Sequence, residues 1–261
     1  MKDAVSYDVV EFGEGIFRKT EATAIQEVPL TIYLNGHEVV TLLCTGKAPG
    51  FLAVGFLKSD GLITDYEQLK DVKVEEDPER LTVHVQTAHD PFKFQRLERS
   101  ITSGCGKGTN FTRNVETIAS TTVTTKLTVT PEQILRLSAE LNERSTLYRA
   151  TGGCHNASLA TPEGILIFRE DIGRHNAIDM ICGECFLDKI PTEDKLIVST
   201  GRIASEILMK VMRLGVSILV SSAAATRFSI DLARKTNMTL IGRVRKGRMV
   251  VYNHSGRIAG L

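Results

Sequence analysis

The pattern of apolar and polar positions differs between the first and the last part of the chain. In the first part, residues 30–34 and 38–44 are predicted to be strands that flank Asn35-Gly36, a dipeptide typical of a tight hairpin turn. A helix followed by two more strands is expected over residues 51–58, 72–75 and 81–87. The helix should end at Asp60-Gly61, so the pattern predicts a small sheet packed with one helix.

Beyond residue 151, predicted strands and predicted helices alternate along the sequence. Strands are expected over 157–160, 165–169, 196–199, 217–220, 239–244 and 249–252, and helices over 174–186, 202–214 and 227–236. Such alternation predicts an α/β layered sheet. Between the parts, residues 120–130 are expected to form a linker and a strand. Thr130-Pro131 should open a helix, because Thr caps well and Pro suits the first turn. We place the boundary near residue 125, giving an N-terminal strand-rich α+β part (1–125) and an α/β domain (126–261).

Composition narrows the class of protein. The 261 residues are 42% apolar and carry a net charge of +1 with no Trp, which argues against a nucleic-acid or membrane surface as partner. No signal peptide is expected at the N-terminus, and no apolar run is long enough to span a bilayer. Five cysteines, an odd number in a chain of this length, favour free thiols in a reducing compartment. We therefore expect a cytoplasmic protein.

Polar side chains follow three successive strands of the predicted sheet. Arg174 and His175 stand where a strand gives way to a helix, a place suited to binding anions, although a salt-bridged strand end would look the same. The next two strand ends carry Ser199, Thr200, Gly201 and Arg202, and then Ser222 and Thr226. These residues could cradle a phosphate group or simply cap helices.

A basic turn lies between the last two strands. It comprises Arg243, Val244, Arg245, Lys246, Gly247 and Arg248. Four cations within six residues repel one another unless they share an anion, so a phosphate-rich ligand is one explanation and a solvated hairpin is the other.

The cysteines fall into different settings. Cys105 lies between glycines and near Lys107, which would favour a reactive thiolate on an exposed loop, although a loop thiol without a role is also possible. Cys182 and Cys185 form a CxxC pair, but they share a helix face with apolar residues, so we expect buried structural thiols and no permanent metal.

A second arrangement is similar to the zinc site of nucleobase deaminases. Cys154-His155 precedes the CxxC pair, as a ligand would in that site, but the required glutamate is replaced by Asn156 and Ala157. A zinc-dependent deaminase-like hydrolase is therefore kept only as a remote alternative, because its proton carrier is missing.

Taken together in this order, the segments resemble the FdhD/NarQ family of formate dehydrogenase accessory sulfurtransferases. The matching stretches are 51–63, the Cys105 loop, 151–155, 169–176, 199–202 and 241–252, and the match runs from about residue 30 to the C-terminus. Each motif is modest alone, but their order is specific.

The resemblance implies a role and a set of partners. Cys105 would accept sulfur as a persulfide from a cysteine desulfurase and pass it to Mo-bis(molybdopterin guanine dinucleotide), the cofactor of the client formate dehydrogenase. The turn 243–248 would bind this cofactor. The family's C-terminal part resembles the cytidine deaminase fold, and its members form homodimers.

One position departs from the family pattern. Many relatives carry Cys-Gly-x-Cys in the loop, whereas Gly108 stands here in the place of the second cysteine. Cys105 would then act alone or with a more distant thiol, such as Cys154. A non-catalytic chaperone that binds the cofactor without using a thiol remains the alternative, and only the sulfur carrier needs Cys105.

Overall fold

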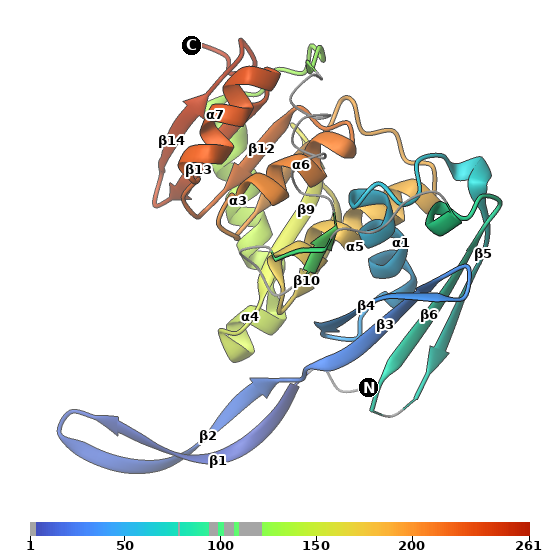
Figure 1. Ribbon diagram of the computed structural model, residues 1–261. Helices are drawn as coiled ribbons and strands as arrows, with labels where there is room; N and C mark the ends of the chain where they lie inside the picture. Colours follow the sequence, from blue (N-terminus) through green and yellow to red (C-terminus); the bar gives the residue numbers. More distant parts are fainter. Residues whose placement is uncertain (1–3, 78, 94–98, 102–106, 110–121) are drawn as a thin grey trace.

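A computed structural model describes residues 4–77, 79–93, 99–101, 107–109 and 122–261, and Figure 1 shows their arrangement. The protein is a mixed α/β structure. A four-stranded sheet has the order β4-β3-β6-β5, and a six-stranded sheet has the order β10-β9-β11-β12-β13-β14. Two two-stranded sheets complete the strands of the described chain: β1 (Ala4–Gly13) with β2 (Ile16–Ile25), and β7 (Arg99–Ile101) with β8 (Lys107–Thr109).

The four-stranded sheet forms as the alternating pattern predicts. Its strands are β3 (Val28–Leu34), β4 (His37–Cys44), β5 (Leu69–Glu76) and β6 (Leu81–Thr87), and helix α1 (Pro49–Ser59) packs against it. Every second residue of β3 is buried, as expected when one face of a strand meets a core. Asn35 and Gly36 both have positive φ, at 50° and 83°, which is the backbone that this hairpin turn requires.

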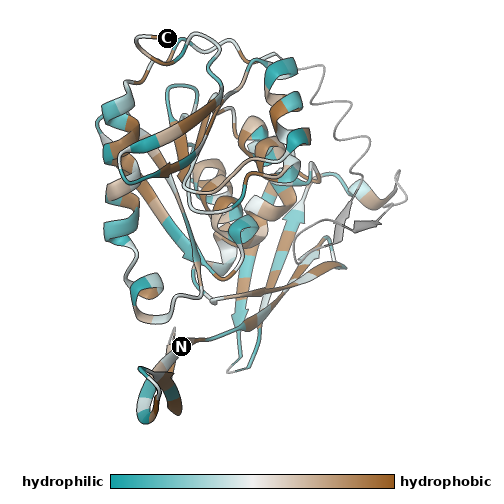
Figure 2. Ribbon diagram, turned by 90° about the vertical axis from the view of Figure 1, so that its left-hand side faces the viewer, coloured by the Kyte–Doolittle hydropathy of each residue, from teal (hydrophilic) through white to brown (hydrophobic). Residues whose placement is uncertain are grey.

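The six-stranded sheet has helices on both faces. Its strands are β9 (His155–Thr161), β10 (Gly164–Asp171), β11 (Leu196–Ser199), β12 (Ile218–Ser221), β13 (Thr239–Arg245) and β14 (Arg248–Asn253). Helices α5 (Arg174–Leu187), α6 (Ser205–Arg213) and α7 (Arg227–Thr236) share one apolar core with the sheet, and α3 (Pro131–Arg144) shares another. Figure 2 shows that the helices carry both apolar and polar positions, as expected when one side of a helix packs on a sheet and the other side faces solvent.

Helix α3 begins as its sequence predicts. Thr130 accepts a hydrogen bond from the backbone N–H of Gln133, whose side chain in turn accepts from the Thr130 N–H, so both parts of a capping box are present. Pro131 follows in the first turn. A short helix, α4 (Thr146–Thr151), joins α3 to β9.

Two helices meet so closely that they bind the two parts into one structure. A Cβ atom on Gly55 of α1 would lie 1.7 Å from the backbone oxygen of Asp179 in α5, and one on Gly183 would lie 1.9 Å from that of Phe51. Only glycine allows backbones to approach this far. Helix α5 is buried on nearly all sides, because α1 covers the part of its surface that faces away from the six-stranded sheet.

The structure corrects two expectations about the secondary structure. Helix α6 begins at Ser205 and not at Arg202, because residues 200–204 form a loop in which Ile203 bridges to Ala225. Residues 122–130 make only an isolated bridge, from Val129 to Ile258, where a strand was expected.

Other elements were not predicted. A long N-terminal hairpin, β1 (Ala4–Gly13) and β2 (Ile16–Ile25), precedes the four-stranded sheet, and β7 (Arg99–Ile101) pairs with β8 (Lys107–Thr109) within the expected loop. Cys105 lies outside the described residues. Among the helices of the described chain, none has the length and hydropathy needed to cross a bilayer.

Candidate functional site at the strand ends

Four strands of the six-stranded sheet end at one edge. Strands β10 and β11 both pair antiparallel with β9, so they point the same way, and β12 and β13 run parallel to β11. Their carboxyl ends, at Asp171, Ser199, Ser221 and Arg245, therefore lie on the same edge. The amino end of β9, at His155, joins them there. Carboxyl edges of such sheets are usual places for ligand sites.

Arg174 lies directly over the loop that follows β11. A Cβ atom on Gly201 would lie 2.7 Å from Cβ of Arg174 and 3.0 Å from its Cδ, so the arginine stem runs across the glycine backbone. The missing side chain at residue 201 leaves the space that the arginine occupies. Two residues that the sequence placed at separate strand ends are thus in contact.

The hydroxyl groups at this edge mainly form hydrogen bonds that fix the loop of residues 200–204. Thr200 Oγ1 accepts a hydrogen bond from the Asn156 N–H at 3.0 Å, and Ser199 Oγ accepts from the Gly201 N–H at 3.2 Å. Ser221 Oγ donates to the Gly201 carbonyl at 2.6 Å. The sequence did not single out Asn156 or Ser221 as loop-fixing residues, because their partners lie far away along the chain.

The next two predicted positions also have local structural contacts. Thr226 is the N-cap of α7, with its hydroxyl accepting from the Ser229 N–H. Ser222 donates its backbone N–H to the Ser199 carbonyl at 3.0 Å, which joins the ends of β11 and β12. Arg202 is exposed in the loop before α6, and so it does not stand in the first turn of a helix as expected.

His175 is held in the seam between α5 and α6. Its Nε2 lies 3.5 Å from Oε2 of Glu206, and one turn further along the same seam Asp179 accepts from Lys210 Nζ at 2.7 and 2.8 Å. Burial is the largest effect on His175 and lowers its pKa, although Glu206 opposes the shift. Burial likewise lowers the pKa of His155, and the nearby Arg174 adds to the effect. Both imidazoles therefore favour the neutral form.

A buried carboxylate ties the first β sheet to this edge. Asp171 accepts from the backbone N–H and hydroxyl of Thr45, at 2.8 and 3.0 Å, and from Asn176 Nδ2 at 2.7 Å. Asn176 Nδ2 also donates to the Leu43 carbonyl at 2.9 Å. Burial raises the pKa of Asp171, and these hydrogen bonds oppose the rise. The strand-end site is thus braced by residues from both parts of the chain.

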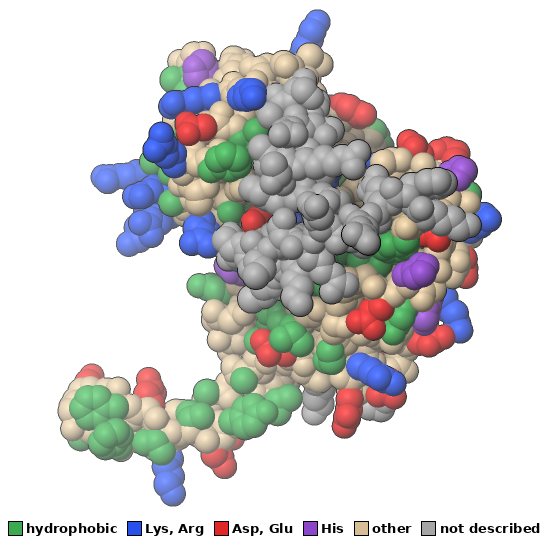
Figure 3. All heavy atoms as spheres, in the orientation of Figure 1, with side chains coloured by type: hydrophobic (Ala, Val, Ile, Leu, Met, Phe, Trp, Pro, Cys, Tyr) green, Lys and Arg blue, Asp and Glu red, His purple; other side chains and the backbone are tan. Residues whose placement is uncertain are grey.

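The basic turn closes the same edge. Lys246 and Gly247 have φ of 50° and 71°, and they reverse the chain between β13 and β14. The Arg243 N–H donates to the Ala223 carbonyl at 2.8 Å, which fixes the turn to the loop after β12. The side chains of Arg243, Arg245, Lys246 and Arg248 are exposed, and none forms an ion pair with a described carboxylate. Figure 3 shows basic side chains projecting from the surface in the region of β13 and β14, at the upper left.

Val244 differs from its neighbours in the turn. Its side chain is 2% exposed and belongs to the core between the sheet and α3. A bulge between Gly242 and Arg245 lets the chain bury this valine while both flanking arginines face solvent. Only the backbone of Val244 is therefore available to a ligand.

The four described cysteines are all buried. Burial raises the pKa of Cys154 to about 11 and that of Cys44, Cys182 and Cys185 to about 12. Each remains a protonated thiol at neutral pH and is a poor nucleophile. The expectation that Cys182 and Cys185 are buried is confirmed. Within the described part of the chain, no three His, Cys, Asp or Glu side chains gather as metal ligands would.

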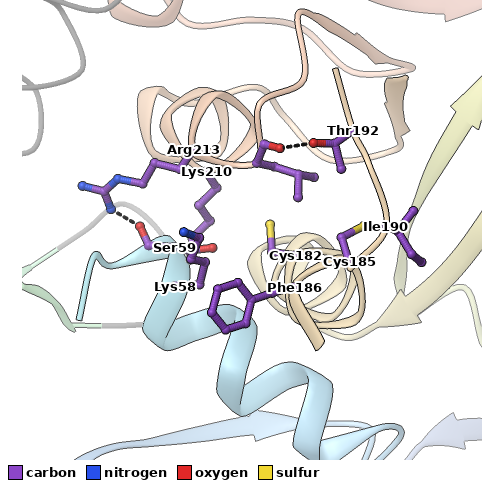
Figure 4. A pocket seen from close by; sticks show the side chains of 10 residues that line it. Lys58, Ser59, Cys182, Cys185, Phe186, Ile190, Thr192, Lys210 and Arg213 are labelled. Carbon is purple, nitrogen blue, oxygen red and sulfur yellow. Dashed lines mark hydrogen bonds between the residues drawn. The ribbon is translucent and has the colours of Figure 1, made fainter. Parts of the chain in front are cut away.

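The CxxC pair borders a pocket of about 200 Å³ between α1, α5 and α6, shown in Figure 4. Three cations line it, and each has a partner: Lys58 donates to the Thr64 carbonyl, Lys210 to Asp179, and Arg213 to the Ser59 carbonyl. The pocket lies at the far end of α5 from Arg174. It is therefore separate from the strand-end site.

Comparisons with known proteins agree with this layout. The sequence profile of the FdhD/NarQ family matches residues 25–259. The chain belongs to the FdhD/NarQ family. It is 39% identical over 253 residues to the "Sulfur carrier protein FdhD" of Bacillus subtilis, covering 96% of each chain. It is 38% identical to the protein of the same name from Geobacillus kaustophilus, covering 96% of this chain and 95% of the relative.

A solved structure shows the same fold. The crystal structure of a putative formate dehydrogenase accessory protein from Desulfotalea psychrophila superposes with a TM-score of 0.79 at 20% identity. The superposition covers 98% of this chain and 100% of the Desulfotalea chain. The family match over residues 25–259 and the identity to the curated relatives confirm the resemblance drawn from the motifs.

Proposed function

We propose that this protein is a sulfur carrier for formate dehydrogenase and that it binds the molybdenum cofactor at the strand-end site. The main observation that supports a cofactor site here is the exposed basic turn. It presents four exposed cations, none ion-paired to a described carboxylate, at the edge where four strands end. Membership of the FdhD/NarQ family supports the sulfur-carrier role.

The cofactor proposed is Mo-bis(molybdopterin guanine dinucleotide), which would be cargo and not a resident group. Its phosphates are suited to guanidinium groups, which bind them through paired N–H donors. Arg245 and Arg248 face each other across the turn and could share one phosphate. Arg174, lying over Gly201, provides a cation at the opposite part of the same edge.

The sulfur chemistry is assigned to Cys105. In the proposed step, its thiolate attacks the outer sulfur of a persulfide on a cysteine desulfurase, and the donor cysteine leaves as a thiolate. Cys105 then carries the outer sulfur as its own persulfide, and no oxidant is required. The four described cysteines support this assignment, because burial keeps them protonated and inaccessible.

The remaining proposals follow the family resemblance. A cysteine desulfurase would be the donor, formate dehydrogenase the client, and the protein would act in the cytoplasm as a homodimer. Residues 1–125 and 126–261 would be two domains, the second with the layering of cytidine deaminases.

Replacing the loop thiol tests the carrier role. Cys105→Ser should fold and still fail to activate formate dehydrogenase in cells that lack the native protein, because serine cannot form a persulfide. Mass spectrometry after incubation with a desulfurase and cysteine should show one added sulfur at Cys105 in the wild type. Cys154→Ser is the matched control and should keep activity. Full activity of Cys105→Ser would remove this residue from the sulfur path.

The alternative is a chaperone that binds the cofactor without sulfur transfer. It is favoured by Gly108, which leaves the loop without a second thiol. Both functions need the basic turn, so Arg245→Ala with Arg248→Ala should weaken binding of guanosine diphosphate at least about tenfold in a calorimetric titration. Lys70→Ala with Arg80→Ala removes two exposed cations elsewhere in the chain and should leave the affinity unchanged. Unchanged affinity in the turn variant would exclude the turn from the site.

A further inference from the structure

Phe228 is an exposed aromatic side chain in the first turn of α7. It is 47% exposed, although the residue that follows it, Ser229, is fully buried. The apolar cores described on the two faces of the six-stranded sheet do not include Phe228. A single exposed apolar residue is ordinary on a protein surface. What sets Phe228 apart is its position at the strand-end site.

The start of α7 lies at the carboxyl edge of the six-stranded sheet. Strand β12 ends there at Ser221, and the loop 222–226 leads directly into the helix. In that loop the Ala223 carbonyl accepts from the Arg243 N–H at 2.8 Å, which is the contact that fixes the basic turn. Helix α7 also packs against β13 and β14, the strands that the turn joins (Figure 1). Phe228 is therefore carried on the same edge as the proposed phosphate-binding cations.

Hydrogen bonds hold the start of α7 to the loop that follows β11. The Thr226 N–H donates to the Ile203 carbonyl at 3.0 Å, and the Ile203 N–H donates to the Ala224 carbonyl at 3.0 Å. The Ser229 hydroxyl lies within hydrogen-bond distance of the same Ile203 carbonyl, at 2.9 Å. The first turn of α7 thus has a fixed place beside the loop that carries Arg202. An aromatic side chain on a backbone fixed in this way loses little conformational entropy when a ligand covers it.

Cations flank Phe228 on both of the chain segments that meet here. The side chain of Arg227, the preceding residue, is 97% exposed, and Arg202 is exposed in the neighbouring loop. Arg227 Nε lies 3.6 Å from Oδ2 of Asp231, one turn later in α7. An aromatic ring among cations suits a nucleotide, because the cations bind the phosphates and the ring stacks on the base.

We propose that Phe228 stacks on the nucleobase of a nucleotide whose phosphates are bound by the basic turn. The inference rests on the proposed function, since it adds a base-binding residue to the same site. Every base has a π face, and a phenylalanine side chain has no hydrogen-bonding group, so Phe228 adds affinity for a base without distinguishing guanine from adenine. Arg245 and Arg248 supply affinity for the phosphates alone. The two contributions are therefore separable by the choice of ligand.

Calorimetric titrations with guanosine diphosphate, adenosine diphosphate and inorganic pyrophosphate test the proposal. Phe228→Ala should weaken binding of both nucleotides about fivefold to a hundredfold and leave the affinity for pyrophosphate unchanged. Phe228→Tyr keeps the ring and should bind like the wild type, whereas Phe228→Leu keeps apolar bulk without a ring and should behave like Phe228→Ala. Phe12→Ala is the matched control: it removes a 62% exposed phenylalanine from β1 and should leave all three affinities unchanged.

A tryptophan at the same position gives a direct readout of stacking. The chain contains no tryptophan, so Phe228→Trp creates a single indole fluorophore. Guanosine diphosphate should quench its emission and pyrophosphate should not, because only a stacked base lies against the indole ring. Phe12→Trp should show no quenching by either ligand.

The outcomes separate this inference from the proposed function. Nucleotide affinity that survives Phe228→Ala, a loss confined to one nucleotide, an equal loss for pyrophosphate, or a Phe228→Leu variant that binds like the wild type would each overturn the stacking role. If Arg245→Ala with Arg248→Ala weakens nucleotide binding and Phe228→Ala does not, the cofactor site stands and the stacking role fails. A wild type that binds neither nucleotide would overturn both.

Discussion

Replacing Gly55 by alanine should separate the two helices that join the parts of the protein. The new Cβ atom would lie 1.7 Å from the Asp179 carbonyl oxygen and 2.7 Å from the Gly183 nitrogen. Both obstacles are backbone atoms inside α5, so no side-chain rotation relieves the clash. The helices would have to move apart by roughly 1.5–2 Å to reach an ordinary contact distance of about 3.5 Å.

The size of the effect follows from two opposing contributions. Alanine is favoured over glycine inside a helix by about 1 kcal/mol. Overpacking of a close-packed contact costs about 1–3 kcal/mol and occasionally more, and a backbone obstacle puts this site at the upper end. We expect a net loss of about 2 kcal/mol in the free energy of unfolding.

Urea unfolding followed by circular dichroism measures this loss, and the same helix offers a control. A Cβ on Gly50 would lie 3.6 Å from Val74 Cγ2, an ordinary contact, so Gly50→Ala should stay within about 0.5 kcal/mol of the wild type. If Gly55→Ala proved as stable as Gly50→Ala, the close helix crossing would be refuted. The crossing matters for function because α5 begins with Arg174 and His175 at the strand-end site.

Three further predictions concern buried groups. Lys210→Met leaves Asp179, which is 1% exposed, without its ion-pair partner and should lower the free energy of unfolding in urea by about 3–5 kcal/mol. Adding Asp179→Leu should restore much of that loss. Equal stability of the single and double variants would contradict this prediction. Burial lowers the pKa of His175, so the unfolded chain binds more protons near the usual pKa of about 6.5, and stability should fall as pH drops through that value. His175→Gln should flatten that part of the stability curve, and an unchanged slope would refute the assignment. Because their pKa values are raised to about 11 and 12, Cys154 and Cys182 should react with iodoacetamide at neutral pH only after unfolding; labelling of the native protein would show otherwise.

Much of the fold could be predicted because its elements carry local signals. Thr130-Pro131 marks a helix start and Asn35-Gly36 marks a hairpin. Apolar alternation marks β3 and β6, and short continuous apolar runs mark the buried strands β11 and β12. The start of α6 was placed too early, because Gly201 and Arg202 suit a helix start, yet the bridge from Ile203 to Ala225 holds them in a loop. The N-terminal hairpin of β1 and β2 gave no clear signal, because strands exposed on both faces lack the alternation of a strand with one buried face.

The candidate site shows the same division. The sequence by itself determined the kinds of residue at the strand ends, the basic turn with its four cations, and the order of motifs that marks the family. Only the tertiary structure decided that Arg174 crosses Gly201, that Val244 turns inward, and that the hydroxyls of Ser199 and Thr200 fix a loop. These contacts join residues far apart in sequence, and their partners are set by strand order and helix packing. Local patterns fix which elements form, whereas burial and contact between distant segments decide what each side chain can do.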